Sequence, residues 1–393
     1  MTRPTGSNLA AVLPAAIWGW LTVARGRYWS AATGLPTPAG PLERWPAVAV
    51  IVPARDEAGL LPETLPSLLA QDYPGLARVV LVDDMSTDGT GSVARSLGRN
   101  AARIPLDVLS GSPRPPGWAG KPWAMAQGTD HALEQVPPPE WLLFTDADVR
   151  HPPSSLRQLV AAALSDRRDA VSLMARLHTT TAWEKLLMPA FVYFFAQLYP
   201  FSWVNRTDCR TAAAAGGCLL VRAGGLRAAG GVEAVAGSTI DDVALARALK
   251  RSGQSIWLGL AGGPGAPEVE SLRSYPRLAD IWEMVARSAY TQLRYNPVLL
   301  AGTVAALSSV YLAPPLLAIS GTALRRPWPA LAGLAAWTAM VASYLPIVRH
   351  YRGSAATAVA LPVTASLYGA MTIDSARRHR MGGVAWKGRL PDT

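Results

Sequence analysis

Residues 141–148 read WLLFTDAD: four apolar residues, a threonine, and two aspartates separated by one alanine. Residues 47–57 (AVAVIVPARDE) and 78–84 (RVVLVDD) have the same form, an apolar run followed by charged residues. Continuous apolar runs of this length are typical of parallel strands that are buried on both faces. With a further strand at 104–109 and helical patterns between the strands, the sequence predicts an open α/β sheet with helices on both faces.

The charged residues that follow these strands are candidates for ligand binding, because open α/β sheets bind ligands at the carboxyl ends of their strands. Asp146 and Asp148 place two carboxylates at one strand end, where their oxygens could hold a hard divalent cation such as Mn²⁺ or Mg²⁺. Such a cation would neutralise a diphosphate leaving group. A D-x-D pair can also cap a loop, and its place beside other acidic strand ends favours the metal site.

Two further loops carry polar candidates at the same edge. Asp83 and Asp84 could hydrogen-bond the base and ribose of a nucleotide, whereas Asp88 is expected to cap the helix that follows. The alternative for the aspartate pair is a turn without a ligand. Arg55 and Glu57 follow the first strand, and their alternative is a solvated loop.

Asp241 and Asp242 open a strongly helical stretch, residues 241–253. A negative charge at a helix N-terminus is favoured by the helix dipole, so capping can account for one carboxylate. The other could act as a general base near an acceptor hydroxyl. The chain has no nucleophile elbow, Walker A loop or dinucleotide fingerprint, which argues against hydrolase, kinase and dehydrogenase functions.

The distribution of charge indicates a membrane rather than a nucleic acid as partner. The 393 residues include only 16% charged residues, and the formal net charge is +10. The excess of Lys and Arg lies entirely in residues 1–45 and 297–393, while residues 46–296 are neutral. A nucleic-acid surface would carry its basic residues on the folded domain. Basic residues that flank apolar runs follow the positive-inside pattern of membrane proteins.

Apolar segments at both ends predict membrane helices. Residues 9–24 form a short apolar run followed by Arg25, which we interpret as an uncleaved helix with the following chain on the cytoplasmic side; a cleaved signal peptide is the alternative. Three apolar blocks at 297–321, 328–348 and 354–373 predict two or three spans. Three spans would place the basic tail outside the cell, against the positive-inside rule.

Two segments near the predicted spans are expected at the membrane surface. Residues 278–295 have apolar residues at helical spacing and predict an amphipathic helix lying on the bilayer. Residues 183–204 are rich in aromatic residues and predict an interfacial or acceptor-facing element, with a buried core helix as the alternative.

The expected organisation divides the chain into five parts. They are an N-terminal transmembrane anchor and linker (1–45), a catalytic domain (46–265), an amphipathic interfacial region (266–296), two or three transmembrane helices (297–375) and a basic tail (376–393). The protein is therefore expected to be a multi-pass protein of the cell membrane with its catalytic domain on the cytoplasmic side.

Six blocks of the sequence resemble the motifs of one enzyme family. They are residues 50–57 (VIVPARDE), 80–90 (VLVDDMSTDGT), 120–128 (GKPWAMAQG), 144–148 (FTDAD), 213–222 (AAAGGCLLVR) and 238–249 (STIDDVALARAL). As an ordered set they resemble the inverting family 2 glycosyltransferases of the GT-A fold. With TQLRY and the WKGR tail included, the chain is more similar to the hopene-associated glycosyltransferases, and more distantly to ceramide glucosyltransferase.

The resemblance implies a GT-A domain with a mixed, mostly parallel sheet, and it implies roles for individual residues. Asp242 matches the catalytic base, as the second member of the pair with Asp241. Asp148 matches the direct metal ligand, with Asp146 beside it. The predicted nucleotide-sugar contacts are Pro53, Arg55, Glu57, Asp83, Asp84, Lys121 and Asp146.

Arg294 belongs to a motif that departs from the family pattern. Lipid-acceptor and processive relatives carry Q/R-x-x-R-W, whereas residues 291–295 here are TQLRY. Arg294 is retained and could stabilise the diphosphate, but Thr291 and Tyr295 replace the family's residues, which argues against processive polymer synthesis. The alternative for Arg294 is an interfacial anchor just before the first C-terminal span.

The resemblance implies transfer of a sugar, with inversion, from a nucleotide sugar to the hydroxyl of a membrane lipid. The expected donor is a UDP-sugar, the expected acceptor a hopanoid-type lipid, and the expected cofactor Mn²⁺ or Mg²⁺. Acceptors of another class (a polyprenyl phosphate, a carotenoid or a glycerolipid) remain alternatives, as does a membrane scaffold that keeps the fold without catalysis.

Overall fold

The computed structural model describes residues 6–99 and 103–381. The described chain forms two compact units. The sheet unit comprises residues 32–178 and 201–274, and the helical unit comprises residues 6–31, 179–200 and 275–381. The WKGR segment of the expected basic tail, residues 386–389, lies outside the described residues.

The sheet unit is built on a seven-stranded sheet with strand order β3-β2-β1-β4-β7-β6-β8. β1 pairs in parallel with β2 and β4, β2 with β3, and β6 with β8, while β7 runs antiparallel to both of its neighbours. The predicted mixed, mostly parallel α/β sheet is therefore confirmed. The strands are β1 Val48–Ala54, β2 Ala77–Asp83, β3 Leu106–Ser110, β4 Trp141–Phe144, β6 Ala170–Met174, β7 Leu219–Arg222 and β8 Ile256–Leu260.

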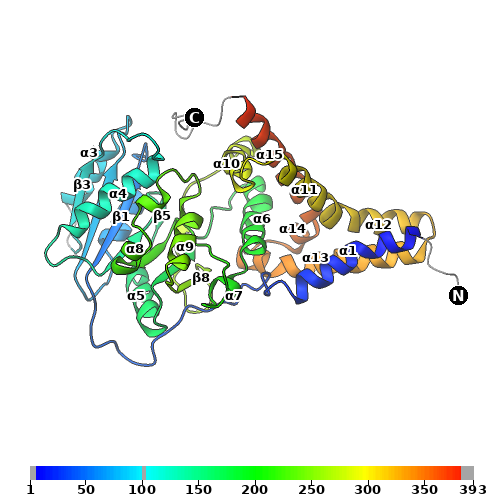
Figure 1. Cartoon of the computed structure of the whole chain (residues 1–393), viewed down its shortest axis with the longest axis horizontal. Coiled ribbons are helices and arrows are strands. Elements are labelled where there is room, and N and C mark those ends of the chain that lie inside the picture. The colour runs from blue at the N-terminus through cyan, green and yellow to red at the C-terminus, as the bar shows by residue number, and fades with distance from the viewer. Residues whose placement is uncertain (1–5, 100–102, 382–393) are drawn as a thin grey trace. The chain divides into compact units, whose positions relative to one another are not determined.

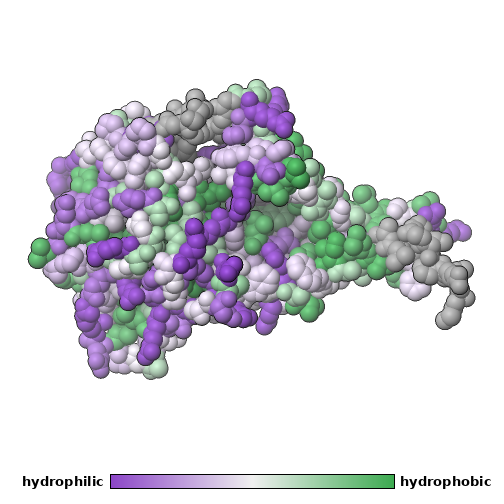
Figure 2. Space-filling view, in the orientation of Figure 1, coloured by the Kyte–Doolittle hydropathy of each residue, from purple (hydrophilic) through white to green (hydrophobic). Residues whose placement is uncertain are grey.

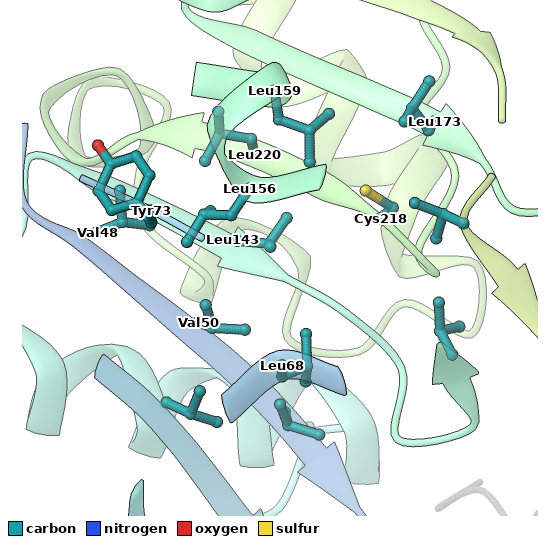
Figure 3. Packing of buried hydrophobic residues seen from close by; sticks show 14 of the residues in the cluster. Val48, Val50, Leu68, Tyr73, Leu143, Leu156, Leu159, Leu173, Cys218 and Leu220 are labelled. Carbon is teal, nitrogen blue, oxygen red and sulfur yellow. The ribbon is translucent and has the colours of Figure 1, made fainter. Parts of the chain in front are cut away.

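Helices cover both faces of this sheet because alternate strand residues point to opposite sides. Val50 of β1 and Leu143 of β4 belong to one hydrophobic cluster with Leu68 of α2 (Leu61–Leu69) and Leu156 of α5 (Ser155–Ser165), as Figure 3 shows. The opposite face packs against α4 (Gly120–Leu133). Gly128 makes this approach possible, since a Cβ there would lie 2.8 Å from Cγ2 of Ile51.

Smaller elements complete the sheet unit, and one of them brings a distant segment to the D-x-D motif. β5 (Val149–Arg150) directly follows that motif and pairs antiparallel with β9 (Glu270–Ser271). The backbone N–H of Leu272 then donates to the carbonyl of Asp148 at 2.8 Å. The remaining helices are α3 Thr90–Arg99, α7 Phe201–Val204, α8 Ala223–Ala228, the short 3₁₀ turn Glu233–Val235 and α9 Asp241–Arg251.

The helical unit contains the apolar ends of the sequence (Figure 1). Its elements are α1 Gly6–Val23, α6 Ala182–Leu198, α10 Leu278–Gln292, α11 Pro297–Leu307, the π-helical turn Ser308–Leu312, α12 Ala313–Ala323, α13 Pro327–His350, α14 Ala355–Val359 and α15 Leu361–Arg380. Within this unit α13 packs along α1 and α12. Hydrophobic residues dominate the surface over these three helices in Figure 2.

Two helical stretches of the described residues are long and apolar enough to cross a bilayer, Pro297–Ala323 and Pro327–His350. The N-terminal apolar helix is shorter, with its apolar part at Val12–Val23. The third predicted block, at 354–373, falls on α14 and α15, and neither helix combines the length and the hydropathy of a span. Of the two or three spans expected, the described chain offers two by this measure.

Most of the aromatic segment at 183–204 is α6, which packs as a core helix of the helical unit and so favours the alternative of a buried helix, while residues 201–204 form α7 of the sheet unit. Leu187 and Tyr193 of α6 are fully buried. The Tyr193 hydroxyl lies 2.7 Å from that of Ser343 in α13 and 3.0 Å from that of Tyr28. The buried Tyr193 hydroxyl therefore has its hydrogen-bond partners inside the helical unit.

The helix predicted at 278–295 forms as α10, but its apolar face is not left free for a bilayer. Ile281 and Val285 are buried within the helical unit. α10 packs against α15, where Trp282 Nε1 donates to Asp374 Oδ2 at 2.8 Å. Packing on another helix produces the same spacing of apolar residues as a membrane surface does, and the placement of α10 at the bilayer stays a prediction.

Candidate active site

The first two strand-end loops are joined to each other at the carboxyl edge of the sheet. Arg55 Nη1 donates to the backbone carbonyl of Asp84 at 2.8 Å, and lies 3.6 Å from its carboxylate. Asp84 is almost fully buried. Asp56 Oδ1 accepts from the backbone N–H of Thr87 at 2.8 Å, and Asp56 itself has a φ of 50°. A non-glycine residue in that conformation is strained, which is common in ligand-binding loops.

Of the remaining acidic residues of these loops, two shape the turns and one lies buried near the site. Asp88 caps α3 as expected, because its Oδ1 accepts from the backbone N–H of Thr90 at 3.0 Å. Asp83 Oδ1 accepts from the backbone N–H of Ser86 at 3.1 Å, so it shapes the turn. Glu57 is buried at the start of the next segment, 8% exposed.

A cluster of one lysine and three aspartates forms the centre of the candidate site. Lys121, in the first turn of α4, places its Nζ 2.7 Å from Oδ1 of Asp146 and 3.4 Å from Oδ2 of Asp241. Burial acts to lower the pKa of Lys121, but the neighbouring carboxylates Asp146, Asp241 and Asp242 outweigh it and hold that pKa above its usual value. Lys121 is therefore a permanent cation at the carboxyl end of β4.

Asp242 has the environment of a base that can titrate near neutrality. Burial, and then repulsion from Asp241, raise its pKa to about 6, while Lys121 and two backbone N–H groups act in the opposite direction. Those N–H groups belong to Gly216, 2.9 Å from Oδ2, and Val243, 2.7 Å from Oδ1. The second bond lies in the first turn of α9, so Asp242 has part of the capping role that the sequence left open.

A small cavity opens between this cluster and the strand ends. It is lined by Pro53, Lys121, Met125, Phe144, Thr145, Gly216, Leu219, Asp241, Asp242 and Leu245. The cavity thus brings together the predicted residues Pro53, Lys121 and Asp242 from three segments that are far apart in the sequence.

The D-x-D carboxylates have the donor chemistry that Mn²⁺ or Mg²⁺ requires. Burial, and then repulsion from Asp146, raise the pKa of Asp148, so a bound cation would relieve this repulsion. Within residues 6–99 and 103–381, no group of three or more His, Cys, Asp or Glu forms a metal cage. Magnesium-type sites often use one or two carboxylates and complete their shell with substrate phosphates and water, so this pair fits such an ion.

The sequence reasoning missed two residues of this site. Gly216 supplies a backbone donor to Asp242, and Arg273 donates from its Nε to Oδ2 of Asp148 at 2.8 Å. The AAAGGCLLVR motif contains Gly216, but its hydrogen bond depends on the approach of α9. Nothing in the local sequence marks Arg273, since it is 125 residues from Asp148 and reaches it through the β5–β9 pairing.

Arg294 is the predicted site residue that the sheet unit does not contain. It follows α10 in the helical unit, and both Arg294 and Tyr295 have positive φ values, 53° and 54°. The Tyr295 ring stacks on His379 of α15, with 4.3 Å between ring centroids. The TQLRY turn is thus held by packing within the helical unit, and a diphosphate contact from Arg294 stays a prediction.

The fold and the acidic strand ends define a nucleotide-sugar-binding domain of the GT-A class. Residues 46–259 match the glycosyltransferase-like family 2, which is more than half of the chain. The chain belongs to this family.

The similar proteins agree with that assignment. Over 103 residues the chain is 31% identical to 4,4'-diaponeurosporenoate glycosyltransferase of Staphylococcus haemolyticus and 35% identical to that of Staphylococcus aureus (strain USA300). Each match covers 26% of this chain, and it spans about a quarter of the relative's length, 24%. The solved mannosyltransferase PcManGT from Pyrobaculum calidifontis, in complex with GDP-Man and Mn²⁺, has the same fold. It shows a TM-score of 0.51 and 22% identity, and the match covers 95% of this chain and 98% of that one.

Proposed function

We propose that this protein is an inverting, membrane-bound glycosyltransferase that moves a sugar from a nucleotide sugar to the hydroxyl of a lipid. The observation that carries the proposal is the environment of Asp242. Its pKa of about 6 leaves it ionised at neutral pH yet basic enough to accept a proton. It lies in one cluster with Lys121 and Asp146, at the sheet edge where α/β folds bind ligands.

Asp242 takes the proton from the acceptor hydroxyl as that oxygen attacks the anomeric carbon of the sugar. A single displacement inverts the anomeric configuration, and the hydrogen bond from Gly216 keeps the carboxylate oriented while it gains the proton. Lys121, the cation paired with Asp146, would stabilise the negative charge that develops on the leaving diphosphate. Mn²⁺ or Mg²⁺, held by Asp148 and Asp146, would neutralise the same leaving group when bound.

The nucleotide is assigned to the joined loops after β1 and β2. Asp84, whose carbonyl and carboxylate lie beside Arg55, is assigned to the base, and the family resemblance assigns Pro53 and Glu57 to the same loop, with Asp83 beside Asp84. The family resemblance favours a uridine diphosphate sugar as the donor. PcManGT was solved with GDP-Man, so GDP-sugars form the natural comparison in any test.

We infer the membrane arrangement from the two long apolar helices. Two spans, Pro297–Ala323 and Pro327–His350, return the chain to the side from which it left. Arg377, Arg378 and Arg380 at the end of α15 then share a side with the chain that precedes the spans. Basic residues favour the cytoplasmic side, so the catalytic domain is placed there, facing cytoplasmic nucleotide sugars. α1 serves as the N-terminal anchor.

A hopanoid-type alcohol is the first acceptor proposed, and a carotenoid acid is the second. The name of the staphylococcal relatives refers to a carboxylate, 4,4'-diaponeurosporenoate. A carboxylate acceptor has already lost its proton at neutral pH, so it needs no general base, whereas an alcohol does. The role of Asp242 therefore discriminates between the two acceptor classes.

The test is transfer of radiolabel into lipid. Membranes that contain the protein are incubated with Mn²⁺ and labelled UDP-glucose, then with other UDP-sugars and GDP-mannose, and are extracted with organic solvent. Each donor is tested with added hopanoid alcohol, polyprenyl phosphate, glycerolipid or carotenoid acid. The Asp242→Asn protein serves as the control that lacks the general base. Mass spectrometry of the labelled product identifies the acceptor.

We expect label in the organic phase that requires both Mn²⁺ and Asp242. Label that survives Asp242→Asn with a carotenoid acid but not with an alcohol would support the second acceptor class. No label with any donor and acceptor, while the purified protein still binds nucleoside diphosphate, would favour a scaffold that keeps the fold without catalysis.

A further inference from the structure

Arg273 joins two carboxylates from different strand-end loops. Its Nε donates to Oδ2 of Asp148 at 2.8 Å, and its Nη2 contacts Oε1 of Glu57. The hydroxyl of Ser271 lies 3.3 Å from the same Oδ2 of Asp148. The side chains of Asp148 and Glu57 are 12% and 9% exposed, and that of Arg273 is 32% exposed. The guanidinium therefore lies over two nearly buried carboxylates and remains accessible from solvent.

Each D-x-D carboxylate thus has its own internal cation. Lys121 pairs with Asp146, and Arg273 pairs with Asp148. Burying a carboxylate without a partner is costly, so this pairing stabilises the loop when no ligand is present. Arg273 also occupies Oδ2, one of the two Asp148 oxygens available to a divalent metal, and its positive charge would repel that metal, so that Arg273 and a metal compete for Asp148.

A guanidinium displaced from Asp148 has a natural new partner in a donor diphosphate. Its planar set of N–H donors fits phosphate oxygens as well as it fits a carboxylate. Glu57, which resemblance assigns to the nucleotide, contacts the same guanidinium and keeps it near the site. The exchange therefore requires only a short movement of a side chain that is already partly exposed.

We propose, building on the proposed function, that Arg273 is a cation that exchanges partners at the donor site. It neutralises Asp148 and Glu57 in the empty enzyme, yields Asp148 to the divalent metal, and then binds the diphosphate of the nucleotide sugar. Metal alone binds weakly because it must displace Arg273, whereas metal and nucleoside diphosphate bind together because the guanidinium gains a phosphate partner. Premature metal binding without donor is thereby suppressed.

The test measures binding rather than turnover, so it is separate from any test of sugar transfer. Free Mn²⁺ is followed by electron paramagnetic resonance in titrations of the purified full-length protein, without nucleotide and with UDP or GDP. Arg273→Gln removes the cation, and Arg273→Lys keeps the charge without the planar donor set. Arg150→Gln is the matched control, because it removes an arginine–carboxylate pair, with Glu270, from the same β5–β9 pairing without touching Asp148.

For Arg273→Gln we expect the affinity for Mn²⁺ alone and the affinity for nucleoside diphosphate to change in opposite directions. Mn²⁺ alone should bind about tenfold more tightly than in wild type, and nucleoside diphosphate with Mn²⁺ about tenfold more weakly. Arg273→Lys should leave the affinity for Mn²⁺ alone near the wild-type value and still weaken the diphosphate. Arg150→Gln should change neither affinity.

An Arg273→Gln protein that binds Mn²⁺ no more tightly than wild type would overturn the proposal and leave Arg273 as a structural ion pair. Unchanged diphosphate affinity in Arg273→Gln, or a wild type that binds neither UDP nor GDP, would overturn the second part of the proposal, that Arg273 binds the diphosphate. If Arg273→Gln does not fold, an unchanged diphosphate affinity in Arg273→Lys overturns the proposal. If diphosphate binds as expected but no donor transfers its sugar, the proposed function fails and the role of Arg273 stands.

Discussion

The backbone N–H of Gly216 donates to Oδ2 of Asp242 at 2.9 Å. The two residues belong to segments that meet only in the folded sheet unit, one before β7 and one in the first turn of α9. The bond fixes the carboxylate in one orientation next to Lys121. A general base must be held in this way to meet a hydroxyl proton, because small displacements of reacting groups are costly in rate.

Gly216→Ala should impair transfer while leaving the fold intact. A Cβ at this position would lie 2.9 Å from Nζ of Lys121 and 3.5 Å from Oδ2 of Asp242, so the lysine side chain would have to shift. We expect kcat to fall by about 10²-fold, as misplaced catalytic groups do. Gly217→Ala is the matched control, because its Cβ would make ordinary contacts of 3.4 Å with Ala175 and Val149. Equal activity of the two variants would argue against this role for Gly216.

Asp242→Asn should abolish transfer to an alcohol and spare nucleotide binding. The amide keeps the shape of the side chain but cannot accept the hydroxyl proton, so we expect a loss of at least about 10²-fold in kcat. Affinity for nucleoside diphosphate, measured by calorimetry, should stay within a few-fold of wild type. Asp208→Asn, in an exposed pair with Arg206, serves as the control. A variant that retains a tenth of the wild-type rate would contradict the assignment.

The rate should depend on pH through Asp242. Its pKa is raised from the ordinary 3.8 to about 6, mainly by burial, and only the deprotonated form can act as base. Activity should therefore rise as pH increases through about 6 and fall tenfold for each pH unit below it. A profile of kcat/KM between pH 4.5 and 8, with protein stability checked at each pH, measures this midpoint. A flat profile across pH 5–7 would exclude a base with this pKa.

Lys121→Gln should move that midpoint to higher pH. Lys121 acts to lower the pKa of Asp242, so its removal leaves three carboxylates with less compensation. We expect an upward shift of about one unit or more, together with weaker diphosphate binding. Lys121→Arg keeps the charge and should retain the wild-type midpoint, and Lys185→Gln, at an exposed position of α6, controls for loss of a lysine. An unchanged midpoint in Lys121→Gln would show that the lysine does not influence the base.

The sheet and the position of its acidic edge could be predicted from the amino-acid sequence. Buried parallel strands leave an apolar run of fixed length, and the chain order of WLLFTDAD and VLVDDMSTDGT places Asp84 and Asp146 where such strands end. The prediction that the sheet is mixed came from the family resemblance. A single antiparallel strand such as β7 has the same apolar pattern as the parallel strands, so the pattern does not reveal its direction. The apolar runs and the acidic residues at the strand ends are local features, so they can be recognised in a few consecutive residues.

Which side chains meet, and which faces of the helices are covered, could be seen only in the folded protein. The apolar residues of α10 pack on α15, and those of α6 lie in the core, although their spacing also fits a membrane surface. Arg273 reaches Asp148 across 125 residues because β9 pairs with β5, and a two-residue strand has no recognisable pattern. Periodicity records that a face is buried, but the identity of the partner depends on contacts between distant parts of the chain.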